Sequence, residues 1–262
     1  MNYAVMDHHN FWQRGEGASS IADADVVFMW NDFCFEAQVR AMQAIGKKVI
    51  VYEHGFGALN DYSELNNHEP LADGYLALGE VTAKFVPNSL VVGNPVYDDL
   101  KEKKEQTGKV LYVGLHWVRD VSGYNTKNYK ELKETYDEYE WNIKTSDKAT
   151  AGIDSDEVWY SGVEGVRSLP RIKSKLREYD AIFTPKAGTF DSFARLMGIP
   201  VYVIDKEESY RQEGDPVSFK IEGDNYIRVG EELEPKSIDM AEYIARPSMK
   251  LDKILEWVDG SI

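Results

Sequence analysis

Short runs of β-branched and aromatic residues alternate with helical patterns along almost the whole chain. Two of these runs, 25–30 and 48–52, flank the segment 36–45, whose apolar residues recur at helical spacing and which is followed by Gly46. Parallel strands need a crossover connection of about a dozen residues or more, which a helix commonly supplies. The alternation therefore predicts a parallel sheet covered by helices on both faces. Further strand-like runs before residue 100 are 3–6, 74–78 and 89–92.

The same alternation restarts after a charged, glycine-containing stretch at 98–108, which is the best candidate for a linker. The chain has 262 residues, enough for two domains that each bury a core. We therefore expect an α/β protein with two Rossmann-like, doubly wound domains, residues 1–104 and 105–262, facing each other across a cleft. In such sheets ligands bind at the carboxyl ends of the strands. The later predicted strands are 109–113, 141–143, 157–160, 181–184 and 200–204, and the later predicted helices are 127–138, 168–179, 189–197 and one or two within 238–258.

The charge balance and the cysteine content restrict partners and location. With 45 acidic and 30 basic residues the formal net charge is −15, which disfavours nucleic acid without excluding it, because proteins that track a phosphate backbone usually present a basic face. The apolar runs are far shorter than the roughly 20 residues of a membrane-spanning helix. The single cysteine, Cys34, cannot form an internal disulfide, and the first residues show no secretory signal pattern. We expect a cytoplasmic protein with no membrane span.

Four of the five histidines follow predicted strands, among them His54 and His116. A neutral histidine can take a proton from a hydroxyl group, and a protonated one can neutralise a phosphate. His54 stands directly before Gly55 in a short glycine-containing segment, so we regard it as a candidate general base. The alternative is a histidine whose ring nitrogens are satisfied by backbone carbonyls. Asp32 and Glu53 also lie at the ends of predicted strands.

The segment 184–192 has the features of a diphosphate-binding turn. Gly188 allows close backbone approach, and Thr189 can cap the helix that follows. The amino terminus of that helix directs unpaired N–H groups at a bound anion, and Lys186 adds a full positive charge. Asp191 could accept hydrogen bonds from ribose hydroxyls. An ordinary helix cap is the alternative interpretation.

Other nucleotide and metal chemistries lack their usual patterns. The chain has neither a phosphate-loop motif nor a Gly-x-Gly-x-x-Gly motif after a strand. One cysteine cannot build a thiolate zinc site, and neighbouring histidines on an extended strand would point to opposite faces. The acidic pairs Asp23 with Asp25 and Asp154 with Asp156 could hold magnesium on a nucleotide, but such pairs arise easily among 45 acidic residues. We therefore expect no metal site.

Four segments resemble parts of one group of proteins, in the same order along the chain. Residues 179–201 resemble the donor-binding segment of GT-B glycosyltransferases, with a strand, a small-residue turn, a helix that carries an acidic residue and then Gly-x-Pro-Val. Residues 91–98 are similar to the Gly-Asn-Pro segment that ends the first domain of UDP-N-acetylglucosamine 2-epimerases. Residues 51–55 resemble the His-Gly segment of the CDP-glycerol glycerophosphotransferases, and residues 109–117 resemble the opening strand of their second domain.

The resemblance implies a GT-B-like fold with a short first domain, because about 100 residues are fewer than this family usually has there. It also implies a glycosyltransferase that moves a sugar from a nucleoside-diphosphate sugar, with UDP expected first, to an acceptor hydroxyl without a metal cofactor. His54 is then the base, with Asp32 or Glu53 in reserve. The implied donor-binding residues are His116, Lys186, Gly188, Thr189 and Asp191.

Two departures and several alternatives accompany the resemblance. Asp191 follows Thr189 by two positions, whereas the epimerases have a glutamate at a different spacing. The epimerase carboxylate pattern is missing, so transfer is favoured over epimerisation. The alternatives are a CDP-polyol phosphotransferase and a non-catalytic GT-B-like protein that binds a nucleotide sugar or a glycan. The acceptor, whether a glycan, a small molecule or a modified nucleic-acid base, cannot be read from the sequence.

Overall fold

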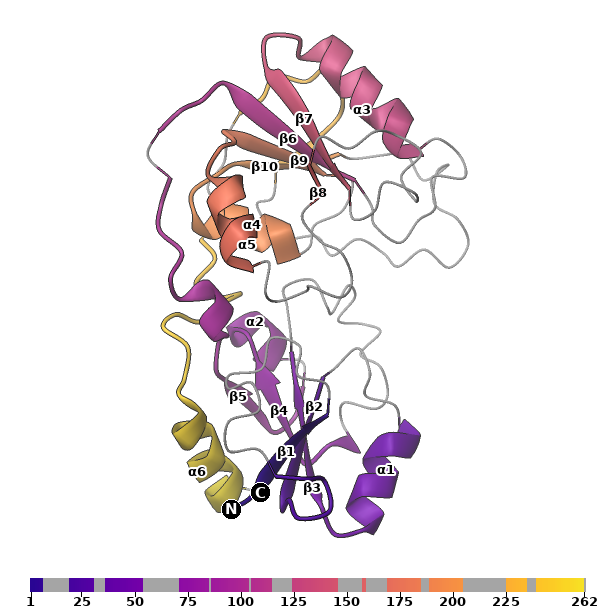
Figure 1. The fold of residues 1–262 in the computed structure, drawn as a ribbon, viewed down its shortest axis with the longest axis vertical. Helices are drawn as coiled ribbons and strands as arrows, with labels where there is room; N and C mark the ends of the chain where they lie inside the picture. The colour runs from indigo at the N-terminus through magenta and orange to yellow at the C-terminus, as the bar shows by residue number, and fades with distance from the viewer. Residues whose placement is uncertain are drawn as a thin grey trace. The chain divides into compact units, whose positions relative to one another are not determined.

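The computed structural model divides into two compact units (Figure 1). The first unit comprises Met1–Asp99 and Asp239–Ile262, and the second comprises Leu100–Ile238. Each unit contains one sheet in which the neighbouring strands are parallel, so the predicted α/β fold with two Rossmann-type sheets is confirmed. The structure describes residues 1–6, 19–30, 36–53, 71–84, 86–103, 105–114, 124–145, 157–158, 169–184, 189–204, 225–234 and 239–261.

The first sheet has its strands in chain order. They are β1 (Tyr3–Met6), β2 (Val26–Trp30), β3 (Lys48–Tyr52), β4 (Gly74–Ala77) and β5 (Ser89–Val91). Helix α1 (Glu36–Ala44) connects β2 to β3, and the short helix α2 (Glu80–Ala83) connects β4 to β5. When successive strands are added on the same side of the growing sheet, right-handed crossovers place all the connecting helices on one face. Val39 of α1 accordingly packs with Val27, Val49 and Tyr75 on one face of the sheet.

The other face of the first sheet is covered by a helix from the far end of the chain, α6 (Leu251–Ser261). Its buried residues Leu251, Ile254 and Val258 recur at helical spacing and form one apolar stripe. This stripe packs on Tyr3, Val5, Val26, Phe28, Ile50, Tyr52, Leu76 and Val92. Figure 1 shows α1 and α6 on opposite sides of the strands. The 3₁₀ helix Pro95–Tyr97 follows β5 and begins at Asn94, whose side chain accepts a hydrogen bond from the Val96 N–H.

The unit boundaries differ from those expected from the sequence. Residues 105–262 are expected to form the second domain, but residues 239–262 belong to the first unit. The connecting segment from Leu100 belongs to the second unit, where the Lys103 N–H donates to the carbonyl of Met197 at 2.8 Å. An amphipathic pattern identifies a helix and its apolar face, but it does not identify the sheet that the face covers. The predicted cleft between the domains stays a prediction.

The second sheet reverses its direction of growth in the middle. Its strands are β6 (Lys109–Val113), β7 (Glu140–Thr145), β8 (Glu157–Val158), β9 (Ala181–Thr184), β10 (Val201–Ile204) and β11 (Asn225–Ile227), in the order β11-β10-β9-β6-β7-β8. The helices are α3 (Tyr124–Thr135), α4 (Leu169–Leu176) and α5 (Thr189–Leu196). Figure 1 shows α3 on one side of the strands and α4 with α5 on the other. Strand β11 lies in a stretch without clear periodicity, so the sequence pattern missed it.

An aromatic cluster forms much of the core between α3 and the second sheet. The ring of Phe183 lies 4.9 Å from that of Trp141 and 5.0 Å from that of Tyr202, measured between centroids. Burial, together with the nearby Tyr139 and Tyr136, raises the pKa of Tyr202 to about 12. These rings lie on β10 and β9, which are adjacent, and on β7, which is separated from β9 by β6, so they tie the three strands to a common core.

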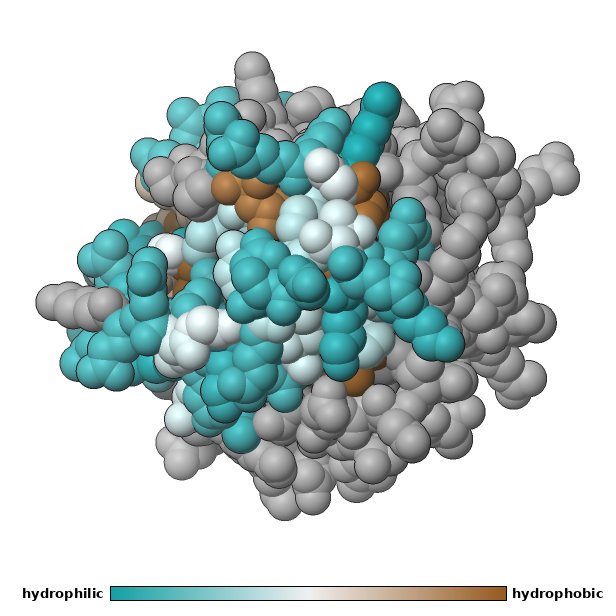
Figure 2. Space-filling view, turned by 90° about the horizontal axis from the view of Figure 1, so that it is seen from above, coloured by the Kyte–Doolittle hydropathy of each residue, from teal (hydrophilic) through white to brown (hydrophobic). Residues whose placement is uncertain are grey.

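Figure 2 shows one face of the molecule, on which the described residues are mostly hydrophilic and the hydrophobic ones form small separate groups. This surface agrees with a chain in which 29 % of the residues are charged. Within the described ranges, no helix is both long and apolar enough to cross a membrane.

Candidate functional site

The reversal of strand order in the second sheet lies between β6 and β9, which are adjacent and parallel. Open α/β sheets bind ligands at the carboxyl ends of the strands beside such a switch point, because the segments that follow the two adjacent strands lead to opposite faces of the sheet and leave a crevice between them. Strand β6 ends at Val113, three positions before His116, and β9 ends at Thr184, two positions before Lys186. The topology therefore brings the starts of both predicted donor segments to the same point. His116, Lys186 and Gly188 themselves lie outside the described residues.

Helix α5 begins at Thr189, where the sequence predicts a helix start after β9. The side chain of Thr189 lies outside the description. Asp191 occupies the first turn of α5 with only 2 % of its surface exposed, and the neighbouring Ser192 is fully buried. A carboxylate in the first turn is favoured by the unpaired N–H groups and the partial positive charge of a helix start. Asp191 therefore lies in the first turn of the helix that follows the carboxyl end of β9, and its role toward ribose hydroxyls stays a prediction.

Buried polar residues gather at the carboxyl ends of both sheets. Burying a polar group costs free energy unless it is hydrogen-bonded, so such residues indicate a structural or a functional role. In the described part of the second unit these residues are Thr184 at the end of β9, Asp191 and Ser192 in α5, and Asn128 in the first half of α3. In the described part of the first unit they are Glu53 after β3, Thr82 in α2 and Asn94 after β5. Sequence reasoning selected Glu53 and Asp191 from this set but not the uncharged members.

Of the three residues predicted to act on the acceptor, the structure describes Glu53. Its side chain is 3 % exposed, and both carboxylate oxygens accept hydrogen bonds within the first unit. Oε2 accepts from the Leu78 N–H at 2.9 Å, and Oε1 accepts from the Thr82 hydroxyl at 3.3 Å. Its backbone N–H donates to the Leu76 carbonyl at 3.0 Å. The carboxylate thus links β3 to the β4–α2 corner, while His54 and Asp32 lie outside the described residues.

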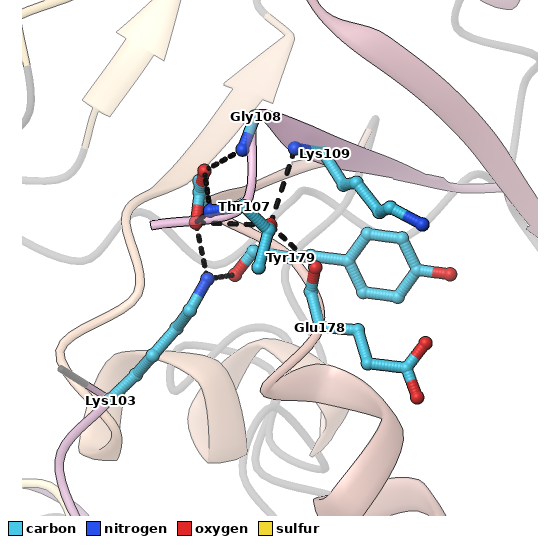
Figure 3. A network of polar contacts seen from close by, with 7 residues as sticks. Lys103, Thr107, Gly108, Lys109, Glu178 and Tyr179 are labelled. Atoms are coloured by element: carbon cyan, nitrogen blue, oxygen red, sulfur yellow. Dashed lines mark hydrogen bonds and ion pairs between the residues drawn. The ribbon is translucent and has the colours of Figure 1, made fainter. Parts of the chain in front are cut away.

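A second carboxylate, Asp180, directly precedes β9 at the opposite end of that strand. Figure 3 shows the polar network around it, with Lys103, Thr107 and Gly108 labelled. Asp180 pairs with the Lys103 ammonium and accepts the Gly108 N–H at 2.5 Å and the Thr107 N–H at 2.8 Å. Lys103 also donates to the Tyr179 carbonyl at 2.7 Å. Burial raises the pKa of Asp180, but the hydrogen bonds from Lys103, Gly108 and Thr107 outweigh burial and lower the pKa. This cluster fastens the connecting segment to the second sheet and lies at the start of β9, opposite its carboxyl end.

No group of three or more His, Cys, Asp or Glu side chains that could hold a metal ion occurs among the described residues. The predicted absence of a metal cofactor and the choice of UDP remain predictions.

No family model and no curated protein matches the sequence. Solved structures similar in fold include a putative UDP-N-acetylglucosamine 2-epimerase from Listeria monocytogenes, at 14 % identity over 70 % of this chain and 57 % of that chain, with a TM-score of 0.46. The UDP-GlcNAc 2-epimerase of Methanocaldococcus jannaschii is similar at 14 % identity over 69 % of this chain and 61 % of that one, with a TM-score of 0.43. The glycosyltransferase SnogD from Streptomyces nogalater is similar at 16 % identity over 69 % and 56 %, with a TM-score of 0.41.

The chain spans less than two thirds of the length of each of these structures. The likeness is one of fold.

Proposed function

We propose that the protein is a glycosyltransferase that moves a sugar from a nucleoside-diphosphate sugar, with UDP as the first candidate nucleotide, to an acceptor hydroxyl. One observation carries the proposal: the second sheet reverses its strand order between β6 and β9, and the segments predicted to bind the donor come directly after these two strands in the sequence. A switch point followed by the start of a helix is where open α/β sheets bind nucleotide phosphates. The buried carboxylate of Asp191 in the first turn of that helix adds a partner for ribose hydroxyls.

The second unit binds the donor in this proposal. The backbone at Gly188 and the N–H groups at the start of α5 hold the diphosphate, and the Lys186 ammonium neutralises it as it leaves. His116, after β6, is the second cation that could face the phosphates. Fixed positive groups of this kind stabilise the leaving diphosphate without a metal ion.

The acceptor reacts at residues of the first unit. His54, with Asp32 in reserve, removes the proton from the acceptor hydroxyl as its oxygen bonds to the anomeric carbon of the sugar. The bond from that carbon to the diphosphate oxygen breaks in the same step, and the nucleoside diphosphate leaves with the electron pair. Exclusion of water from the site would suppress hydrolysis of the donor.

Isothermal titration calorimetry with UDP, CDP, GDP, ADP and dTDP, with and without magnesium, tests donor binding. We expect one nucleotide to bind, and Lys186→Ala and Asp191→Asn each to weaken it by about tenfold or more, as loss of a charge-assisted hydrogen bond does. Glu140→Gln is the control, because it removes a carboxylate charge from the exposed start of β7, at the end of the second sheet opposite the carboxyl ends of its strands. Failure of every nucleotide to bind, or equal weakening in the control, would contradict the proposal.

The identity of the bound nucleotide and the behaviour of His54 separate the proposal from its alternatives. Selective binding of CDP and its polyol conjugates would favour a CDP-polyol phosphotransferase. In a transferase His54→Ala lowers kcat by about 10²-fold and leaves nucleotide affinity unchanged. Nucleotide-sugar binding without turnover on any acceptor would instead favour a non-catalytic binding protein.

A further inference from the structure

The corner between β4 and α2 in the first unit has no capping side chain of its own. Gly79 is the N-cap residue of α2, in extended conformation with φ −154° and ψ 178°, and no side chain of the corner caps the helix. A Cβ at Gly79 would lie 2.3 Å from the backbone carbon of Tyr243 and 2.4 Å from the carbonyl oxygen of Glu242. The returning C-terminal segment therefore excludes every capping residue except glycine here. The N–H groups at the start of α2 must find acceptors elsewhere.

The C-terminal segment supplies one such acceptor, and Glu53 receives two further hydrogen bonds from the corner. The Val81 N–H donates to the Glu242 carbonyl at 3.1 Å. The Leu78 N–H, just before the corner, and the Thr82 hydroxyl both donate to the carboxylate of Glu53. Glu53 thus braces the corner on both sides of Gly79, and a carboxylate suits this position because its two oxygens can accept from two donors at once.

These contacts give Glu53 a different task from the reserve base that its position in the sequence suggests. A general base must reach the proton that it removes, whereas both oxygens of Glu53 accept hydrogen bonds from its own unit and its side chain is 3 % exposed. Together with the bond from its N–H to the Leu76 carbonyl, they anchor the residue directly before His54 to β4 and α2.

We infer that Glu53 is a positioning residue: its carboxylate fixes the carboxyl end of β3 against the β4–α2 corner and so sets where His54 begins. The inference rests on the proposed function, in which His54 is the base. It adds that the C-terminal segment contributes to the same corner, because that segment imposes glycine at position 79 and its Glu242 carbonyl accepts the Val81 N–H.

The variants Glu53→Gln and Thr82→Val test this role, with Thr135→Val as the matched control because its exposed hydroxyl donates to the Glu131 carbonyl within α3 of the second unit. We expect Glu53→Gln to lower kcat by about tenfold, as small misplacements of a reacting group do, with the donor KM and the pH profile unchanged. Thr82→Val should have a smaller effect of the same kind. The double variant should be no slower than Glu53→Gln alone, because both substitutions remove one shared interaction.

Loss of the acidic limb of the pH profile in Glu53→Gln would make Glu53 the base and overturn the inference, as would an unchanged kcat. Amide hydrogen exchange supplies a measurement that needs no substrate. Exchange at residues 50–53 and 76–82 should accelerate by about tenfold in Glu53→Gln and Thr82→Val, but not in Thr135→Val. Unchanged exchange would overturn the anchoring role even if the protein proves to be a transferase. Absence of nucleotide binding would instead remove the proposed function while the exchange result still decides whether Glu53 anchors β3.

Discussion

Both sheets consist of parallel strands, but their two faces are covered by helices from different parts of the chain. The second sheet grows in one direction from β6 to β8 and in the other from β9 to β11, so right-handed crossovers place its own helices on both faces. The first sheet grows in one direction from β1 to β5, and its crossover helices α1 and α2 leave the second face open. Helix α6 covers that face. Strand order therefore decides which unit completes its own core and which one needs a distant part of the chain.

The largest expected effect follows from removing the cover that α6 provides. Ile254→Asp places an unpaired charge in the fully buried stripe of α6, and we expect it to destabilise the first unit by about 4 kcal/mol or more. Urea unfolding combined with hydrogen exchange measures each unit separately, and the second unit should keep its protection. The matched control is Glu256→Gln on the exposed side of α6, which should change little. Equal loss of protection in both units would mean that they fold as one.

The close passage of the C-terminal segment over the first sheet can be tested at Gly93. It has a φ of +64°, and a Cβ there would lie 2.1 Å from the Ala245 carbonyl oxygen. Gly46 has a similar φ of +78° but nothing within 4 Å of its Cβ position. Gly46→Ala should cost about 1 kcal/mol from backbone strain, and Gly93→Ala about 3 kcal/mol because the backbone must also move. Chemical denaturation measures both losses of unfolding free energy. Equal losses would show that the C-terminal segment near Ala245 moves aside without cost.

In the second unit Asp180 holds the connecting segment that begins at Leu100, through contacts with Lys103, Thr107 and Gly108. Asp180→Asn removes the ion pair with Lys103 and weakens the bonds from Thr107 and Gly108, so we expect a loss of about 2 kcal/mol at neutral pH. Glu140→Gln is the control, because its pair with Lys109 is exposed and should contribute less than about 1 kcal/mol. A loss in the control as large as that in Asp180→Asn would argue against a special role for the cluster.

The lowered pKa of Asp180 leads to a prediction for the stability of the second unit in acid. The pKa of Asp180 is lowered in the folded state, so its contribution is fully present above the ordinary aspartate pKa of about 4. The contribution is lost as the pH falls through the lower, folded-state pKa. The free energy of unfolding of Asp180→Asn should therefore depend less on pH below about 4 than that of the original protein. Parallel curves for the two proteins would refute this.

The smallest effect concerns the aromatic core of the second unit and appears only in alkali. The pKa of Tyr202 is raised to about 12, so the stability from its buried neutral phenol is fully present below its ordinary pKa of about 10. It is lost as the pH rises from there to about 12. Tyr202→Phe should be nearly as stable as the original protein at pH 7 and less sensitive to alkali. Urea unfolding from about pH 8 to pH 11 measures the difference, which should be absent if Tyr202 ionises like an exposed tyrosine.

Local patterns were sufficient to predict much of the fold and one side of the candidate site. Runs of β-branched, aromatic and other apolar residues located β1 to β10, because the burial of a strand is reflected in the types of a few neighbouring residues. The start of α5 at Thr189, with Asp191 in its first turn, was likewise readable from a turn followed by an amphipathic helix. Strand β11 was missed because Asn225–Ile227 is too short and too poorly patterned to stand out.

The sequence by itself determined the parallel α/β class, the alternation of strands and helices, and the polar residues at the strand ends, since all of these depend on residues close together in the chain. Only the tertiary structure decided the order of the strands, the assignment of α6 to the first sheet, and the tasks of Glu53 and Asp180. Hydrophobic burial is not directional, so the apolar stripe of α6 does not indicate from the sequence which of the two sheets it covers. A carboxylate takes its role from donors such as Leu78 and Lys103, which lie 25 and 77 residues away in the chain.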